Sequence, residues 1–563
     1  MSSLILGPML RYADEECATV WVETDVPCQV EVLGESRSTF AVAGHHYAIV
    51  ILDGLRPGEP QEYQVRLDGE VAWPEPGSRF PPSVIRTRAP EEPLRLAFGS
   101  RRATRPDVPP YCLDKSADKR GMGADALRAL ALRMLRGEPA EWPHGILLVG
   151  DQVYADEVSP QTLEYIRSRR DTTRPPHEEV ADFEEYARLY REAWSEPVVR
   201  WLFSVVPSAM IFDDHDVHDD WNTSHAWREE MQRTDWWQTR IVGALSSYWL
   251  YQHLGNLTPP AIAEEGVLAR LQEVPDGWPV LRDLATAADR EADGHKGHRW
   301  SYRRDRGRIR IVVIDSRCGR VLQGRREMVD RREWEWIQQQ ATGDFDHLLF
   351  VSSLPVLLPP SIHFLESWNE AVCAGAWGRR AAAVGEKIRQ AVDLEHWGAF
   401  RNSFTRLMEL VAEITSGRRG EVPASVVFLS GDVHYAYLAE ASFPPEYGVR
   451  APVYQVVASP IRNPIQRAVQ LGDRFSRTRP ARWIGQALAR RAGVPAPPYT
   501  WAVRKGPWFE NNLALLEMDG RELSLTFTLA ITDDANDPAL ETAWAGELVR
   551  RPLPELDEAA RPR

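Results

Sequence analysis

Alternation of apolar and polar residues dominates the first 90 residues of the chain. Residues 18–23 (Ala-Thr-Val-Trp-Val-Glu), 29–33 and 63–67 alternate in this way, which is typical of half-buried β-strands. Turn sequences such as Asp53-Gly54 separate the runs. We therefore expect residues 1–90 to form an all-β sandwich domain.

From Leu94 onward the pattern changes to strands that alternate with helices, which indicates an α/β domain. Strands are expected at 94–98, 146–149 and 347–352, with hairpins at 300–315 and 513–529. Helices are expected over 124–135, 182–205, 235–254, 325–341 and most of 381–415. We assign residues 91–545 to this domain and residues 546–563, which are rich in proline and charge, to a loose tail.

Composition and charge exclude several classes of partner. The formal net charge of −14 argues against nucleic acid or an anionic membrane. No apolar run reaches the roughly 20 residues of a membrane span, and no basic segment precedes the first apolar stretch.

Five cysteines without a C-x-x-C spacing fit a reducing compartment. We expect a cytoplasmic protein; the sequence does not determine its oligomeric state.

Three apolar runs of strand length stop abruptly at acids. They end at Gly150-Asp151, at Phe212-Asp213-Asp214-His215-Asp216 and at Ser430-Gly431-Asp432-Val-His434. Buried strands present functional groups at their ends, and so many carboxylates can share one pocket only if cations neutralise them. The pattern predicts a multi-metal hydrolytic centre.

Each of these motifs also has a simpler interpretation. The first is compatible with a surface turn whose Asp caps a helix, the second with a solvated acidic loop, and the third with an isolated histidine. Arg101, Arg102 and Arg317 also follow strand ends, either as clamps for an anionic oxygen or as ordinary surface residues. Residues 393–397 are expected to pack or to line the substrate side.

The three motifs together resemble the PhoD-like alkaline phosphatase D family of the calcineurin-like metallophosphoesterases. The resemblance implies a four-layer α/β/β/α catalytic sandwich preceded by a β-sandwich domain, with metals at the strand ends. The stretch Leu52-Asp-Gly-Leu-Arg-Pro-Gly before Tyr63 also resembles an immunoglobulin or fibronectin-III module.

Carried over by position, the resemblance implies a role for each motif residue. The implied metal ligands are Asp151, Tyr154, Asp214, Asp432 and His434. His215 would contact the reacting phosphate. The implied metals are iron and calcium, with manganese or zinc as alternatives.

One position departs from the family. The segment Phe98-Gly-Ser-Arg101 has Arg101 where the family commonly has a cysteine ligand, and a guanidinium stays protonated and cannot ligate a metal. Either the metal content differs, or the guanidinium replaces one cation. Arg101 is also a candidate clamp for the phosphate.

The predicted function is a metal-dependent phosphoesterase that hydrolyses small-molecule phosphate mono- or diesters through a metal-activated water. Because of Arg101, the alternative is a catalytically weak or inactive protein of this fold that binds an anionic ligand. A third interpretation is a scaffold whose β-sandwich docks a partner.

Overall fold

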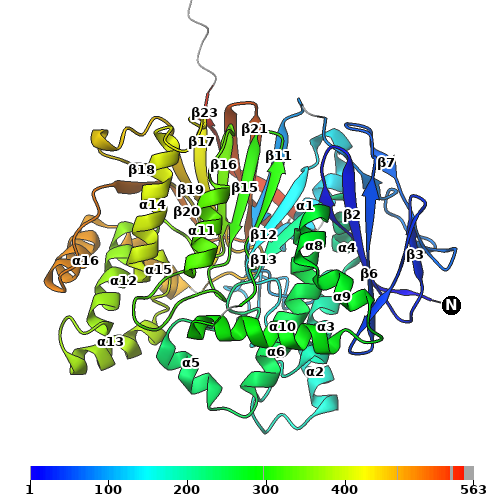
Figure 1. Cartoon of the computed structure of the whole chain (residues 1–563), viewed down its shortest axis with the longest axis horizontal. Coiled ribbons are helices and arrows are strands. Elements are labelled where there is room, and N and C mark those ends of the chain that lie inside the picture. Colours follow the sequence, from blue (N-terminus) through cyan, green and yellow to red (C-terminus); the bar gives the residue numbers. More distant parts are fainter. Residues whose placement is uncertain (1, 90, 296, 466, 533–536, 551–563) are drawn as a thin grey trace, which may run out of the picture.

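A computed structural model describes residues 2–89, 91–295, 297–465, 467–532 and 537–550. The chain forms three sheet regions with helices around them (Figure 1). Most of the predicted tail, 551–563, lies outside the described residues. The last strand continues to Val549, past residue 546, where the tail is predicted to begin.

The N-terminal region is all-β, as predicted. One sheet has the order β1 (Leu4–Ala13), β2 (Cys17–Thr24), β6 (His45–Asp53), β5 (Phe40–Val42). A second has the order β4 (Glu35–Ser38), β3 (Gln29–Val32), β8 (Val65–Leu67), β9 (Glu70–Trp73), and β10 (Val84–Ile85) pairs with β7 (Gln61–Glu62). All pairings are antiparallel. Inward-facing Val20, Val50, Val30 and Val65 form one core between the two four-stranded sheets.

Two larger sheets carry the rest of the chain. The six-stranded sheet has the order β13 (Ser208–Ile211), β12 (Gly145–Val149), β11 (Leu94–Gly99), β21 (Asn512–Asp519), β22 (Glu522–Thr532), β23 (Pro538–Val549). The seven-stranded sheet has the order β14 (Tyr302–Arg306), β15 (Ile309–Ile314), β16 (His347–Ser352), β17 (Ser425–Ser430), β19 (Val453–Val457), β18 (Ala436–Ser442), β20 (Thr500–Trp508). This mixed α/β architecture was predicted.

Helices cover the sheets and fill the lower half of the view in Figure 1. The α-helices are α1 (Ala126–Arg136), α2 (Pro160–Arg169), α3 (Phe183–Trp194), α4 (Pro197–Val205), α5 (His225–Gln232), α6 (Trp237–Tyr248), α7 (Leu254–Asn256), α8 (Pro259–Glu265), α9 (Val267–Gln272), α10 (Trp278–Asp289), α11 (Arg331–Gln340), α12 (Pro360–Cys373), α13 (Arg379–Ala391), α14 (Arg401–Thr415), α15 (Arg467–Ser476) and α16 (Arg479–Arg491). A π-helical turn, η2 (Trp249–His253), joins α6 to α7. Short 3-10 turns are η1 (Pro139–Glu141), η3 (Arg290–Asp293), η4 (Trp397–Ala399) and η5 (Pro445–Tyr447).

Two predicted helices differ from the observed ones. The single helix expected over 182–205 is broken between α3 and α4, because Pro197 cannot continue a helix and instead occupies the first turn of the next one. The helix expected from 325 begins at Arg331, where Asp330 caps it by accepting from the amide of Glu333. In both cases a residue that favours a helix start, Pro197 or Asp330, sets the boundary, although the spacing of apolar residues predicts a longer helix.

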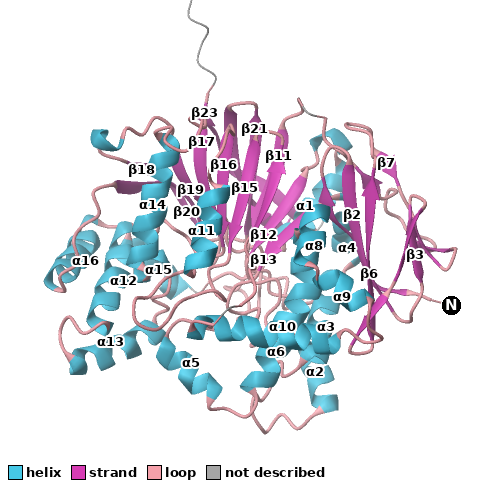
Figure 2. Cartoon of the chain, viewed as in Figure 1, coloured by secondary structure: helices cyan, strands magenta, loops and turns pink. Residues whose placement is uncertain are grey.

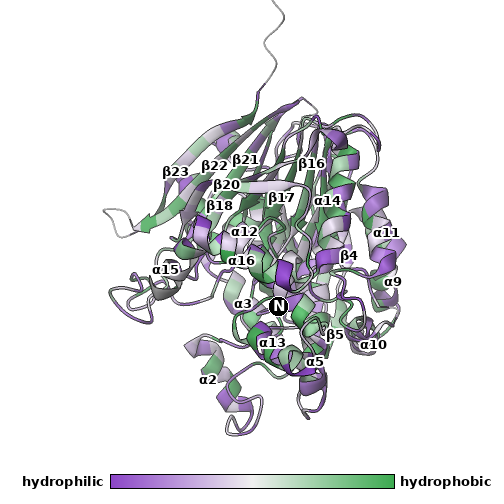
Figure 3. Cartoon of the chain, turned by 90° about the vertical axis from the view of Figure 1, so that its left-hand side faces the viewer, coloured by the Kyte–Doolittle hydropathy of each residue, from purple (hydrophilic) through white to green (hydrophobic). Residues whose placement is uncertain are grey.

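Alternation along the seven-stranded sheet divides its side chains between two cores. On β15, Val312 and Ile314 pack with residues of α11 and α14, while Ile311 and Val313 share the large core that also contains β11 and β12 of the other sheet. Figure 3 shows strands β16 and β17 largely green, whereas α2 and α11 carry hydrophilic purple residues. The inner strands are therefore buried on both faces, as expected for parallel strands.

Candidate metal centre

The acid-bearing strand ends meet at one edge of the two sheets. β11, β12 and β13 run parallel to one another, as do β15, β16 and β17. Their carboxyl ends therefore face the same side, where Figure 2 shows loops gathered below the strands. These loops carry Arg101, Asp151, Asp213, Arg317 and Asp432.

The ends of β11 and β17 touch directly. A Cβ added to Gly431 would lie 2.1 Å from the Ser100 Oγ and 2.2 Å from its Cβ, so only glycine permits this approach. The same Ser100 hydroxyl accepts a hydrogen bond of 3.2 Å from the amide of Asp432. The Ser-Gly-Asp sequence of the third motif thus joins the two sheets at the candidate centre.

The Arg101 guanidinium lies among the predicted ligands. Its Nε is 3.1 Å from Asp151 Oδ2, and Nη1 is 2.7 Å from His434 Nε2. Its Nη2 donates to Asp432 Oδ1 and lies 3.8 Å from Asp214 Oδ1. Four of the five predicted ligands therefore surround one fixed positive charge. Arg102, by contrast, pairs with Asp125 at 2.9 Å.

A second guanidinium, that of Arg317, completes the charge balance. Arg317 is fully buried. It pairs with Asp213, lies 3.4 Å from Asp214 Oδ1 and donates to Glu395 Oε2 at 2.5 Å. Buried carboxylates at this density require such compensation. Of the three candidate arginines, Arg101 and Arg317 thus reach the centre. We call Arg101, Asp151, Asp213, Asp214, Arg317 and Asp432 the central cluster.

Each ligand atom of Asp432 and His434 already has a partner within hydrogen-bond distance. Asp432 Oδ2 is 2.8 Å from His396 Nε2, and its Oδ1 accepts from Arg101. His434 Nδ1 lies 2.8 Å from the Asn463 carbonyl oxygen, which leaves Nε2 to accept from Arg101. These two predicted ligands therefore hold the guanidinium.

Asp151 and Asp214 each have one oxygen that accepts no hydrogen bond from the described residues. Within the described part of the chain, Asp151 Oδ1 and Asp214 Oδ1 are buried without a hydrogen-bond partner. Candidate ligand atoms of Asp151, Asp214 and His215 lie within 4.8 Å of one another. The Tyr154 hydroxyl is 3.5 Å from Asp151 Oδ2. An orphaned pair of buried oxygens fits a cation, so this side of the cluster fits one metal ion.

Burial and charge shift the pKa of several groups in opposite directions. Burial raises the pKa of Asp151 well above its usual range and that of Asp213 to about 7. For Asp432, burial opposes ionisation, but Arg101 and His396 outweigh it and lower the pKa. Burial and the nearby Arg101 lower the pKa of His434 to about 3. The imidazole of His434 is therefore neutral.

His215 carries the opposite shift. Burial alone would lower its pKa, but Asp156 and Asp214 outweigh burial and raise it well above 6.5. Its Nδ1 lies 2.8 Å from Asp156 Oδ2, while Nε2 lies 3.7 Å from Asp219. The imidazolium is held by one nitrogen and keeps a proton on the other.

The backbone is strained at the same place. Arg101, Asp151, Asp432 and His434 have φ values of 57°, 50°, 66° and 58°, a region that side chains with a Cβ rarely adopt. Such strain persists only where surrounding contacts impose it, and it gathers at functional sites. The strain thus coincides with the residues that sequence motifs selected.

Sequence reasoning missed several supporting residues. Asp216 accepts hydrogen bonds from the amides of Asp151, Gln152, Val153 and Asp213, and so ties the first motif to the second. His396, expected only to pack or to line the substrate side, joins Glu366 to Asp432. Asn463 donates to the Tyr154 hydroxyl at 3.0 Å. Only Asp216 had a local signal, its place within the second motif.

Comparisons with known proteins relate two parts of the chain to family models and its fold to a solved structure. Residues 133–262 match the family model described as PhoD-like phosphatase, and residues 1–85 match one described as a domain of unknown function (DUF7800). A search of curated proteins found no significant match. A solved structure entitled "Structure of PhoD" is similar over 98% of this chain and 93% of its own, with a TM-score of 0.59 and 12% identity.

The structural match establishes the shared fold, and the family match contains the first two motifs. Among the described residues, no helix is long and apolar enough to cross a bilayer. Residues 133–262 therefore match the PhoD-like family, the one that the three motifs resemble, and the rest of the chain shares the fold of the solved structure.

Proposed function

We propose that the protein is a metal-dependent phosphoesterase that hydrolyses small-molecule phosphate mono- or diesters. The observation that carries this proposal is the convergence of Asp151, Asp214, His215 and Arg101 at the carboxyl ends of β11, β12 and β13. The match to PhoD-like phosphatases supports it. We also propose the four-layer α/β/β/α arrangement, because the two sheets share one core and helices cover outer faces.

The proposed metal site is smaller than the family resemblance implies. Asp151 and Asp214 would hold a cation through their Oδ1 atoms, with Tyr154 beside them. Arg101 would supply a second positive charge, since Asp432 and His434 already contact it. A bound cation of this kind lowers the pKa of a coordinated water and neutralises charge on phosphoryl oxygens. Iron and calcium remain the proposed metals, with manganese or zinc as alternatives.

The protein residues have separate tasks in this proposal. Arg101 and Arg317 keep the carboxylates in place as fixed charges, because their donors face the acids. His215 is the general acid: Asp156 orients its Nδ1, and the proton on Nε2 is available to a phosphoryl or leaving oxygen. His396 positions Asp432 and takes no proton from the substrate.

Turnover of an aryl phosphate and of a bis-aryl phosphate, with each of the four metals supplied, tests the proposal. We expect Asp151→Asn to reduce activity at least about 1,000-fold, because it removes both a proposed ligand and a partner of Arg101. The exposed hairpin substitution Asp519→Asn is the matched control and should leave activity unchanged. Unchanged turnover in Asp151→Asn would refute the assignment.

Asp432 and His434 both contact Arg101. This observation favours one alternative, a catalytically weak or inactive protein of this fold that binds an anionic ligand. Metal analysis separates the two. Protein that holds no metal at Asp151, and does not turn over either ester after metal is supplied, would support the alternative.

A further inference from the structure

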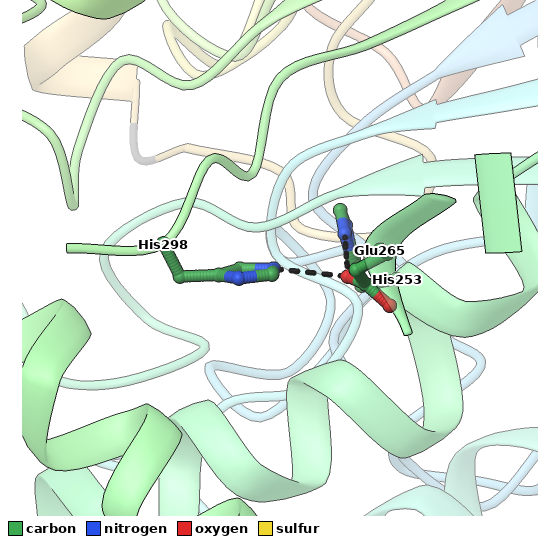
Figure 4. A group of neighbouring side chains, drawn as sticks. All are labelled: His253, Glu265 and His298. Atoms are coloured by element: carbon green, nitrogen blue, oxygen red, sulfur yellow. Dashed lines mark ion pairs between the residues drawn. The ribbon is translucent and has the colours of Figure 1, made fainter. Parts of the chain in front are cut away.

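A second cluster of metal-binding side chains lies outside the central cluster. His253 ends the π-helical turn η2, Glu265 ends α8, and His298 lies in the segment before β14. Figure 4 shows both imidazoles directed at the same carboxylate. We call these three residues the histidine cluster.

The three side chains are close and largely buried. The Nε2 atoms of His253 and His298 lie 3.2 and 3.1 Å from Glu265 Oε1. The exposed fractions of the side chains are 1% for His253, 13% for Glu265 and 16% for His298. The ligand atoms all lie within 4.8 Å of one another. In the described part of the chain, no ion pair joins Glu265 to an arginine or lysine.

Hydrogen bonding alone satisfies this cluster poorly. Trp249 Nε1 also donates to Glu265 Oε1, at 3.2 Å, so three ring nitrogens approach one oxygen. The other oxygen, Oε2, is buried without a partner among the described residues, and His298 Nε2 makes no hydrogen bond despite its short distance to Oε1. Buried polar atoms without partners need another explanation, such as an ion.

We propose that His253, Glu265 and His298 bind a zinc ion. Two imidazoles and one carboxylate are a known zinc ligand set, with a water as the fourth ligand. Tetrahedral coordination with bonds of 2.0–2.1 Å places ligand atoms about 3.3 Å apart, close to the two nitrogen–oxygen distances. Trp249 supplies the hydrogen bond that orients the ligating carboxylate.

The site joins three segments of the chain: η2, α8 and the segment before β14. The Trp300 ring packs against both imidazoles, with centroid distances of 5.0 Å to His253 and 4.5 Å to His298. A zinc ion would therefore fix the segment before β14 to η2 and α8. Zinc bound there would stabilise this part of the folded state by binding it, and this effect does not depend on the proposed phosphoesterase activity.

The test uses the Asp151→Asn variant of the full chain, which removes a proposed ligand of the central cluster, and any zinc bound elsewhere is identified by comparison with the double variants below. Zinc is added, excess is removed by gel filtration, and zinc per protein is measured by elemental analysis. We expect one zinc per chain, and the visible absorption of tetrahedral Co²⁺ when cobalt replaces zinc. Adding His298→Ala or the isosteric Glu265→Gln should abolish stoichiometric binding and weaken zinc affinity at least 100-fold.

His295→Ala is the matched control, because His295 is an exposed histidine of the same segment, and it should retain the zinc. Zinc should also raise the Tm of Asp151→Asn but not that of the double variants. If Asp151→Asn binds no zinc, or if His298→Ala and Glu265→Gln leave its zinc content unchanged, the proposed site does not exist. Activity of the wild-type protein does not enter either outcome.

Discussion

The central cluster and the histidine cluster solve the same problem differently. Both bury carboxylates, which is costly unless a positive charge lies nearby. In the central cluster, Arg101 and Arg317 provide that charge from the chain itself. In the histidine cluster, the side chains that contact Glu265 are two imidazoles and an indole, and no arginine or lysine of the described residues pairs with it. The comparison teaches that motif acids alone do not specify metal content; the cations already built into a site must be counted.

The largest expected effect comes from removing a built-in cation. Arg101→Ala removes the guanidinium that pairs with Asp151 and Asp432 in a buried site, and we expect a loss of about 3–5 kcal/mol in the free energy of unfolding. Because a cation can replace the missing charge, an added divalent metal should restore part of this loss. Urea unfolding with and without metal measures both effects.

Arg11→Ala is the control for this experiment. Arg11 is equally buried, but it donates to the carbonyl oxygens of Ser208, Tyr251 and Gln252 and has no carboxylate partner among the described residues. Its loss should destabilise the protein without any recovery by metal. If metal restores neither variant, the guanidinium of Arg101 does not stand in for a cation.

The sequence predicted the parts of the site that follow from strand ends. Asp151, Asp214 and Asp432 could be selected because each follows an apolar run, and parallel strands present their ends together. Glu366 and His396 could not, because α12 and the loop before η4 reach the centre only through tertiary packing. For the same reason, the sequence shows that Arg101 is unusual at its position, but the spacing of residues does not predict its four partners.

The fold shows the same division. Strands and hairpins were predictable from alternation, such as β21 with β22, because the period of a strand is local. Strand β23 was missed, since its outward-facing residues blur the pattern. The association of the two large sheets at Ser100 and Gly431 depends on contacts more than 300 residues apart. No local rule reports such a contact.

A smaller effect on the free energy of unfolding is expected when one glutamate near each cluster is changed to glutamine. Glu395 lies between Arg317 and Arg320, so Glu395→Gln should cost about 3 kcal/mol whether or not metal is present. Glu265→Gln should cost about 1 kcal/mol in metal-free protein, the value of ordinary hydrogen bonds, and more when zinc is supplied. Unfolding of both variants with zinc and with chelator checks this. An equal response of the two variants to zinc would remove the distinction between the clusters.

The smallest effect concerns a site with one histidine and two glutamates, whereas the histidine cluster has two histidines and one glutamate. At the contact between the β-sandwich and α3, His45 lies 2.9 Å from Glu23 and 2.8 Å from Glu184. One imidazole between two carboxylates takes a proton. Burial opposes this, but the two hydrogen-bonded carboxylates outweigh it and raise the pKa of His45 to about 9. The pKa of Glu184 falls to about 2, mainly because His45 donates a hydrogen bond to its carboxylate.

The sign of the resulting pH dependence follows from these values. A folded-state pKa above the unfolded value of 6.5 gives stability that is fully present below about pH 6.5 and is lost as pH rises through about 9. We expect the stability difference between wild type and His45→Gln to be on the order of 1 kcal/mol at pH 6 and to vanish by about pH 10. His46→Gln is the control, since burial lowers the pKa of His46 and the proton is already absent at neutral pH. If the stability difference between wild type and His45→Gln stays constant across this pH range, the imidazole of His45 is neutral. Its contacts with Glu23 and Glu184 would then stabilise the fold by packing and not by charge.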